Sequence, residues 1–372
     1  MRIVCLSDAI VNRNGVGSYY SDLMDHLKET CECAELICPG VNGKNGTFSY
    51  TLTTSLPGDP TQRLYFPKIH SLMPRIRKID PDVVILPTPG PYGLAGFGLS
   101  KYFGLKLCVG YHTQYDKLTD LYWKHWSSCM GRVYMKCLNR LLFSAGDVVV
   151  ANSDEMVQRA KADGARTVQM IGTPIAKTFL NDPPATISPE LRSVCFCGRL
   201  TDEKNIPDIL SAATRLRNIR FTIAGDGPLR EEVQNSADRL DNLHYIGWVG
   251  RKDVKSVIDE SDMMILPSKI ESFGTIALEA MSRRRLVLVS GECGIINWPD
   301  LKKGVYTIRN DETLSNAIRR ISNIDYSERL QKAENACSAA RAFNDFTIGQ
   351  WTDLFSTFSS KPPAYRIHAK RR

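Results

Sequence analysis

Short apolar runs with the residue pattern of buried strands alternate with longer helical patterns along this chain of 372 residues. A segment with four prolines and no helical period, residues 172–189, divides the alternation into two stretches. The strand-like runs are residues 2–7, 34–38, 83–87, 106–111 and 147–151 in the first stretch and 193–197, 220–224, 243–246, 263–266, 286–290 and 304–308 in the second. Because consecutive parallel strands need a crossover connection, usually a helix, we expect an α/β protein with two doubly wound, mainly parallel sheets.

The proline-containing segment sets the domain boundaries that we expect. A first domain is predicted at residues 1–175 and a second at residues 186–345, followed by a helix and a basic tail within residues 346–372. The chain is 43% hydrophobic and 24% charged, which is an ordinary globular composition and sufficient for two cores.

Two acidic residues of the second stretch lie eight positions apart, on either side of a turn. The strand-like run at residues 263–266 leads into Glu271 and Gly274, and Glu279 follows inside an apolar, helix-forming run. The N–H groups of a helix's first turn and the helix dipole together favour an anion at such a turn. Two solvated glutamates on a surface helix would show the same spacing, so the pattern alone leaves both interpretations open.

The distance along the helix gives the two acids different roles. Glu279 lies about five residues into the helix, or roughly 7 Å from its start. An acid at that distance does not meet a phosphate at the helix start but can accept hydrogen bonds from hydroxyls beside it. The arrangement suits a sugar nucleotide, with Glu271 facing the sugar, the helix start at Phe273, Gly274 and Thr275 facing a phosphate, and Glu279 facing the ribose.

A second loop carries two cations. Gly198 and Arg199 follow the strand-like run at residues 193–197, and Lys204 lies five positions after Arg199, just before a helical pattern. Arginine offers a planar fork for two phosphate oxygens, and lysine adds a mobile point charge, so the pair suits a diphosphate. A solvated arginine and a helix-flanking lysine would be the structural alternative.

In order and spacing, these residues resemble the retaining glycosyltransferases of GT-B fold in the large group 1 family, GT4, and especially its glycolipid-forming members. The resemblance implies that Arg199 and Lys204 bind the donor diphosphate, while Glu271 binds hydroxyls of the transferred sugar. The Gly-Asp-Gly-Pro turn at residues 225–228 and the segment 243–249 resemble further family motifs. By this resemblance Val249 contacts the nucleotide base through its backbone, and the C-terminal helix returns to the first domain.

The first domain carries less specific motifs. A glycine turn with Gly15 and Gly17 follows the first strand, and the family resemblance implies that one of their amides approaches the donor phosphate. A dinucleotide-binding site is the rival, but a third glycine and an acid at the end of the next strand are both missing. His112 follows the strand-like run at residues 106–111, at the edge of the sheet where open α/β folds bind ligands. The family has a histidine here that contacts the transferred sugar, although a lone histidine is often structural.

The resemblance implies a retaining hexosyltransferase with a front-face mechanism and neither a metal nor another cofactor. The diphosphate leaves as the acceptor hydroxyl attacks from the same side, and the charge on the leaving group is stabilised by Arg199, Lys204 and the helix start. Two other functions remain open: a GT-B enzyme that isomerises a sugar nucleotide, and a non-catalytic GT-B subunit. Residues 283–285 and 175–177 depart from the family pattern, because arginines replace a helix-closing glycine and an aspartate is absent.

Charge and targeting give weaker indications. The formal net charge is +8, and basic and aromatic residues gather within residues 117–143. This segment is either a membrane-surface patch for a lipid acceptor or a helix packed on the sheet with solvated lysines. Nucleic acid is not expected, since no recognised motif supports it. The eleven cysteines form no Cys-x-x-Cys pair and no export signal is evident, so we expect a cytoplasmic protein, peripheral at the cytosolic membrane face.

Overall fold

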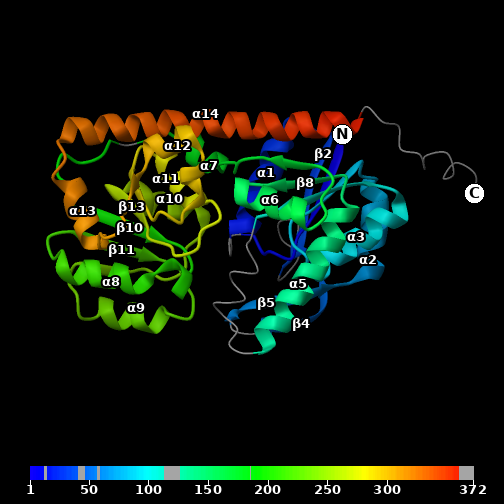
Figure 1. Ribbon diagram of the computed structural model, residues 1–372, viewed down its shortest axis with the longest axis horizontal. Helices are drawn as coiled ribbons and strands as arrows, with labels where there is room; N and C mark the ends of the chain where they lie inside the picture. Colours follow the sequence, from blue (N-terminus) through cyan, green and yellow to red (C-terminus); the bar gives the residue numbers. More distant parts are fainter. Residues whose placement is uncertain (12–14, 41–46, 57–58, 113–125, 185, 360–372) are drawn as a thin grey trace, which may run out of the picture. The chain divides into compact units, whose positions relative to one another are not determined.

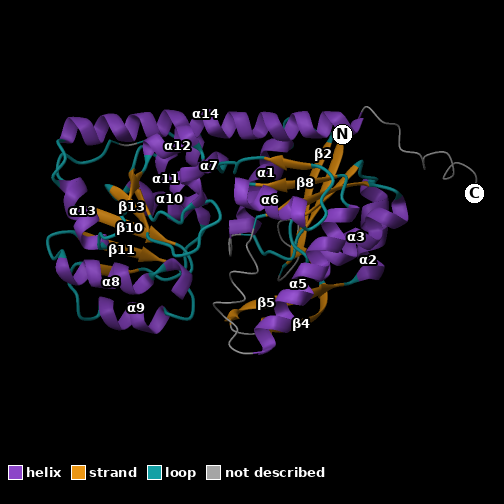
Figure 2. Cartoon of the chain, viewed as in Figure 1, coloured by secondary structure: helices purple, strands orange, loops and turns teal. Residues whose placement is uncertain are grey.

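The computed structural model describes residues 1–11, 15–40, 47–56, 59–112, 126–184 and 186–359. It divides into two compact units: a first unit formed by Met1–Pro174 with Phe346–Arg372, and a second unit formed by Ile175–Asp345. Figure 1 shows an α/β arrangement in each unit, and Figure 2 shows the strands of each between helices. The predicted α/β class with two parallel, Rossmann-like sheets is confirmed.

The first unit is built on a parallel sheet of seven strands in the order β3-β2-β1-β6-β7-β8-β9. These strands are β1 (Arg2–Leu6), β2 (Cys33–Pro39), β3 (Thr47–Phe48), β6 (Val83–Leu86), β7 (Lys106–Tyr111), β8 (Val148–Ala151) and β9 (Val168–Met170). The helices are α1 (Gly15–Leu27), α2 (Ile69–Ile79), α3 (Pro91–Phe103), α5 (Trp126–Ala145) and α6 (Asp154–Ala162). The strand order reverses at β1, which places the carboxyl ends of β1 and β6 beside each other.

Alternation along β1 divides the core of this unit into two layers. Val4 and Leu6 pack with side chains of α2, α3, α5 and α6 on one face. Ile3 and Cys5 pack on the other face with side chains of α1 and with Trp351 of the last helix, α14 (Tyr326–Ser359). Because successive side chains of a strand point to opposite faces, an apolar run such as residues 3–6 indicates a strand that is covered on both sides.

The second unit contains a parallel sheet of six strands in the order β12-β11-β10-β13-β14-β15. The strands are β10 (Ser193–Cys197), β11 (Arg220–Ala224), β12 (Leu243–Tyr245), β13 (Met263–Leu266), β14 (Leu286–Val289) and β15 (Tyr306–Thr307). The helices are α7 (Lys177–Leu180), η1 (Asp202–Lys204), α8 (Ile206–Arg215), α9 (Arg230–Ala237), α10 (Arg251–Asp259), α11 (Thr275–Ser282), η2 (Gly294–Asn297), α12 (Pro299–Gly304) and α13 (Leu314–Ser322). Figure 1 shows α8 and α9 on one side of this sheet and α10 and α11 on the other.

The structure corrects three details of the sequence analysis. The segment predicted without helix contains α7, a single turn. The last helix is longer than predicted, and it contributes residues to the second unit as far as Asp345 and to the first unit from Phe346. A two-stranded antiparallel sheet, β4 (Tyr50–Leu56) with β5 (Asp59–Pro67), was not predicted.

Helix α11 ends without the glycine of the family pattern, and the structure shows how. Arg284 adopts a left-handed conformation with φ of 57°. Its N–H donates to the Met281 carbonyl at 2.9 Å, and that of Arg285 to the Ala280 carbonyl at 3.0 Å. This is the double hydrogen bond of a Schellman motif, with arginine where glycine is usual. The helix end keeps the common geometry at a cost of about 1 kcal/mol.

The side chain of Arg283 gives this departure a structural role. It is 2% exposed and donates to both carboxylate oxygens of Asp259, at 2.7 and 2.9 Å. It also donates to the carbonyls of Phe179, Asp182 and Pro183. Arg283 therefore fixes the irregular segment around α7 to the end of α11 and to helix α10.

Candidate functional site

The candidate site of the second unit lies at the carboxyl ends of β10 and β13. These strands are neighbours and run parallel, with Val194 opposite Met263. Their following loops therefore leave the same edge of the sheet side by side. The loop after β10 carries Arg199 and leads into the short helix η1, which ends at Lys204, and the loop after β13 carries Glu271.

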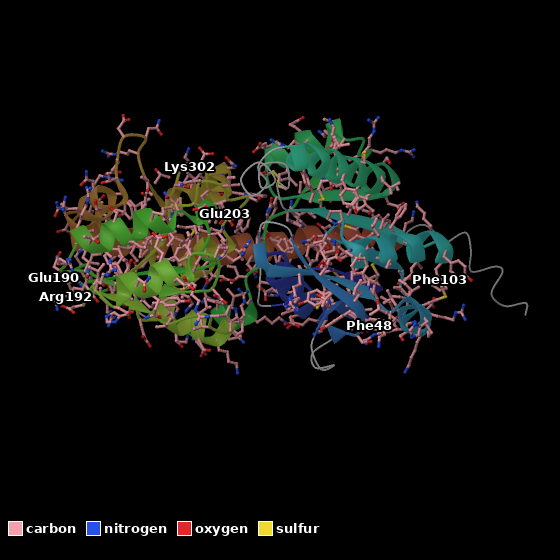
Figure 3. The ribbon with its side chains drawn as sticks, turned by 90° about the horizontal axis from the view of Figure 1, so that it is seen from below. Phe48, Phe103, Glu190, Arg192, Glu203 and Lys302 are labelled. Carbon is pink, nitrogen blue, oxygen red and sulfur yellow. The ribbon has the colours of Figure 1, made fainter. Side chains whose placement is uncertain are left out.

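Lys204 and Glu271, which are 67 positions apart in sequence, form an ion pair across the two loops. Lys204 Nζ donates to Glu271 Oε2 at 2.6 Å, and both side chains are mostly buried. The N–H of Lys269 also donates to the Glu203 carbonyl at 2.8 Å, which joins the loops through their backbones. Arg199 lies 3.7 Å from the buried carboxylate of Glu203. Figure 3 labels Glu203 and shows it well apart from an exposed ion pair of the same unit, Glu190 with Arg192.

The start of helix α11 completes this cluster. Gly274 has φ of +95°, and a Cβ there would lie 2.7 Å from Cys293 Sγ. No side chain of the described residues caps this helix start, so its first N–H groups remain available to an anion. Phe273 is buried beneath the turn, and Thr275 begins the helix. The predicted phosphate position thus has the backbone geometry of an anion site.

The Arg199 loop rests on the predicted glycine turn. A Cβ on Gly225 would lie 1.8 Å from the Gly198 carbonyl oxygen, and one on Gly227 would lie 2.5 Å from that of Leu200. Leu200 N–H donates to the Asp226 carbonyl at 3.0 Å. Two glycines are therefore needed for the backbones to approach so closely, and they fix the loop that carries the cation.

Glu279 is fully buried, and its partner was not predicted. Its carboxylate lies 2.6 Å from Arg251 NH1, at the start of helix α10. Burial raises the pKa of Glu279, and the guanidinium of Arg251 opposes that effect. Arg251 in turn lies over the ring of Phe179, 5.4 Å from its centroid. Nothing in the spacing of the motif pointed to this arginine.

Val249, the predicted base contact, is half-buried between β12 and α10. The preceding Gly247 accepts a 2.8 Å hydrogen bond from Gly225 N–H, which joins this segment to the glycine turn. Val249 also lies two residues before Arg251, so the segment and the partner of Glu279 belong to one continuous stretch.

The first unit holds the remaining predicted residues. Gly15 and Gly17 lie in the first turn of helix α1, whereas a turn was predicted; residues 12–14, before them, lie outside the described residues. Gly17 is buried and Gly15 is exposed. The helix begins earlier than its first large residues indicated, and its opening turn contains two glycines.

His112 is buried at the end of β7, between two tyrosines of helix α1. Its Nε2 lies 2.7 Å from the Tyr20 hydroxyl, and its ring lies 4.5 Å from that of Tyr19, centroid to centroid. Burial lowers the pKa of His112 to about 3, so the ring is neutral at physiological pH. Of the predicted segment 117–143, residues 117–125 lie outside the described residues, and residues 126–143 lie in helix α5.

Two family profiles match the chain: Glycosyl transferases group 1 over residues 181–339, and Glycosyltransferase Family 4 over residues 13–176. A GDP-mannose-dependent alpha-mannosyltransferase of Mycolicibacterium smegmatis is 25% identical over 76% of this chain and 77% of its own. A GDP-mannose-dependent alpha-(1-6)-phosphatidylinositol dimannoside mannosyltransferase of Mycobacterium tuberculosis is 26% identical over 39% and 38%. The chain spans less than half of three further curated relatives, at 28%, 39% and 46% of their lengths. The structure of Anabaena HepE in complex with UDP-glucose has a TM-score of 0.71 at 16% identity, covering 97% of this chain and 100% of that one.

Proposed function

The chain belongs to the group 1, family 4 glycosyltransferases, whose GT-B fold it shares, and we propose that it transfers a hexose from a nucleoside diphosphate sugar to a lipid or saccharide acceptor with retention of anomeric configuration. The observation that carries this proposal is the cluster of Lys204, Glu271 and Arg199 beside the start of helix α11. It combines two cations for a diphosphate with one carboxylate for sugar hydroxyls.

Electrostatics supports the donor part of the proposal. A nucleoside diphosphate carries about two negative charges at neutral pH, and Arg199, Lys204 and the first turn of α11 supply donors for its oxygens. Lys204 is mostly buried against Glu271, with 19% of its side chain exposed. A charge in such a place interacts more strongly with an anion than one in bulk water. Relatives that use GDP-mannose, and a fold neighbour that binds UDP-glucose, agree with a nucleotide sugar.

The proposed mechanism is front-face displacement. The oxygen of the acceptor hydroxyl attacks the anomeric carbon on the face from which the diphosphate leaves. The bond between that carbon and the phosphate oxygen breaks with its electron pair, and the departing phosphate takes the acceptor proton. Arg199, Lys204 and the helix start stabilise the charge that develops on the leaving group. Because this positive charge comes from the protein, the proposed reaction requires neither a metal nor another cofactor.

Glu271 is assigned to sugar hydroxyls in this proposal. A double displacement would need a carboxylate free to attack the anomeric carbon from the opposite face. Glu271 instead accepts a 2.6 Å hydrogen bond from Lys204. A carboxylate held in this way is suited to accept hydrogen bonds from hydroxyls beside the diphosphate.

We assign the acceptor side to the surface of helix α5. Val133 and Tyr134 are 57% and 58% exposed, and Leu141 is 44% exposed, two turns further along the helix. Lys136 and Arg140 lie among them and are exposed. Exposed apolar side chains beside cations suit the surface of an anionic bilayer, where the enzyme would meet a lipid acceptor. In the described residues, no helix has the length and apolarity needed to cross a bilayer.

The test is donor binding followed by transfer. Isothermal titration of the chain in EDTA against UDP, GDP and ADP and their hexose conjugates should identify one tight nucleotide. Incubation of that nucleotide sugar with lipid and saccharide acceptors should then release the nucleoside diphosphate only with an acceptor, and NMR of the product should show the donor's anomeric configuration. Turnover without an acceptor would indicate the isomerase, binding without turnover the non-catalytic subunit, and inverted product would contradict the mechanism.

A further inference from the structure

The two ring nitrogens of His112 have different surroundings. Nε2 lies 2.7 Å from the Tyr20 hydroxyl. Nδ1 is buried and has no hydrogen-bond partner among the residues that the structure describes. His112 is 8% exposed and Tyr20 is fully buried, so their hydrogen bond is shielded from bulk water.

The hydrogen bond between these side chains decides where the imidazole proton lies. Burial lowers the pKa of His112 to about 3 and raises that of Tyr20, so the ring is neutral and the phenol keeps its proton. If Nε2 carried the imidazole proton, the Tyr20 hydrogen and the Nδ1 lone pair would both lack partners among the described residues. If Tyr20 donates to Nε2, only the Nδ1–H lacks one. Because buried polar groups without partners are costly, the second arrangement is favoured.

We propose that Tyr20 is a positioning residue, which holds His112 in the tautomer with its proton on Nδ1 so that the ring offers an N–H donor to an oxygen of the transferred sugar. This rests on the proposed function above. The place is appropriate, because His112 follows β7 at the carboxyl edge of the sheet, where open α/β folds bind ligands. A neutral N–H donor selects a sugar oxygen without attracting or repelling charge.

The surrounding fold leaves room for this bond and fixes the ring. A Cβ on Gly110 would lie 2.1 Å from the Tyr20 hydroxyl and 3.0 Å from His112 Nε2, so only glycine admits the phenol. Tyr19 lies against the imidazole face, and its own hydroxyl donates to the Gly172 carbonyl and accepts from Trp351 Nε1, at 2.9 and 3.0 Å. Two consecutive tyrosines therefore set the orientation of the ring and its tautomer separately.

The first test reads the tautomer directly, without any substrate. Long-range ¹⁵N–¹H correlation spectra of the ¹⁵N-histidine-labelled chain, assigned with His112→Gln, should show a protonated Nδ1 and an unprotonated Nε2 for His112. Tyr20→Phe should move the proton toward Nε2. The matched control is Tyr92→Phe, which removes another buried hydroxyl of the same unit, one that donates to the Phe48 carbonyl at 3.3 Å. That control should leave the His112 spectrum unchanged.

The second test separates chemistry from donor affinity. With the nucleotide sugar identified above, Tyr20→Phe should lower kcat about tenfold, the effect of one weakened transition-state contact. The Kd for the free nucleoside diphosphate should stay within about twofold of the wild-type value, because the proposed diphosphate ligands lie elsewhere. Tyr92→Phe should retain the wild-type kcat.

A proton on Nε2 in the wild-type protein would overturn the proposal, as would a Tyr20→Phe variant that keeps both the tautomer and kcat. If the chain transfers no sugar at all, the proposed function is wrong, and a sugar oxygen is then not the partner of His112 Nδ1. The spectra would still decide whether Tyr20 sets the tautomer, so the two failures are distinguishable.

Discussion

In the second unit, the candidate site residues are held by opposite charges: Lys204 lies 2.6 Å from Glu271, and Arg199 lies 3.7 Å from Glu203. In the first unit, His112 is neutral and is held by a stacked tyrosine and one hydroxyl. The two regions also differ in backbone, since Lys204 ends the short helix η1 and Glu271 lies on a loop, while His112 directly follows strand β7.

This difference indicates that the two units are suited to different tasks in binding a substrate. An ion pair can exchange part of its interaction for an arriving anion, so the second unit is suited to supply affinity for a diphosphate. A buried hydrogen bond between neutral groups gives little attraction at a distance but fixes geometry well, so the first unit is suited to orient a sugar. Substitutions should therefore change affinity in one region and orientation in the other.

The largest effect is expected from removing both cations. The double variant Arg199→Ala with Lys204→Ala should weaken nucleoside diphosphate binding by about 4 kcal/mol, or roughly a thousandfold, because each charge-assisted hydrogen bond contributes about 2 kcal/mol. Isothermal titration measures this. The matched control replaces Arg192 and Lys303, an exposed arginine and lysine of the same unit, by alanine and should bind normally. If both double variants bound the nucleoside diphosphate equally well, Arg199 and Lys204 would not supply its affinity, and the contrast between the two units would be wrong.

Removing the partner of Glu279 should affect stability next. Arg251→Met should destabilise the second unit by about 3 kcal/mol, because it leaves a fully buried carboxylate without its counter-charge. Urea denaturation measures the loss. The double variant Arg251→Met with Glu279→Gln should recover most of it, since no buried charge remains. A single variant as stable as the wild type would show that this pair is solvated.

Lowering the pH should destabilise the first unit by about 2 kcal/mol through the protonation of His112 in the unfolded state. His112 has a folded-state pKa of about 3, below the unfolded value of about 6.5. Its contribution is therefore complete above pH 6.5 and is lost as the pH falls toward 3. Between pH 7.5 and 5 the loss is about 2 kcal/mol. Comparing urea denaturation at these pH values for the wild type and His112→Gln isolates it, with the exposed His70→Gln as the control. An identical pH dependence in the His112 variant would contradict its burial as a neutral ring.

The smallest effect concerns the end of helix α11. Arg284→Gly should stabilise the second unit by up to about 1 kcal/mol, because glycine adopts the left-handed conformation without steric cost. Thermal unfolding followed by circular dichroism would detect it. Gly291→Ala, in a position with open space, serves as a neutral comparison. Destabilisation by Arg284→Gly would mean that the arginine side chain contributes more than its backbone conformation costs.

Most of the fold could be predicted because buried parallel strands have continuous apolar runs. Strands β4 and β5 were not predicted because a two-stranded sheet buries few side chains, and Leu52 and Phe66 on it are exposed. The first half of α14 was not predicted as a helix for another reason. Its buried side chains include the small residues Ala333, Ala336 and Ala340, which give a weak apolar period.

The family resemblance implied that Lys204 and Glu271 serve one site, and the structure shows why they meet: they follow adjacent parallel strands that end at the same edge. The partners Arg251 of Glu279 and Tyr20 of His112 could not be predicted in this way. Tyr20 is 92 positions before His112, and the pairing depends on the space left by Gly110. Such contacts follow from packing between elements, which no local pattern contains.

The five hydrogen bonds of Arg283 have a mechanical consequence. They join the stretch from Phe179 to Pro183, just after the start of the second unit, to the last turn of helix α11 and to Asp259. The first turn of the same helix faces the proposed diphosphate position. A displacement of this stretch would therefore also displace the last turn of α11, which lies about two helical turns from the proposed position of the leaving group.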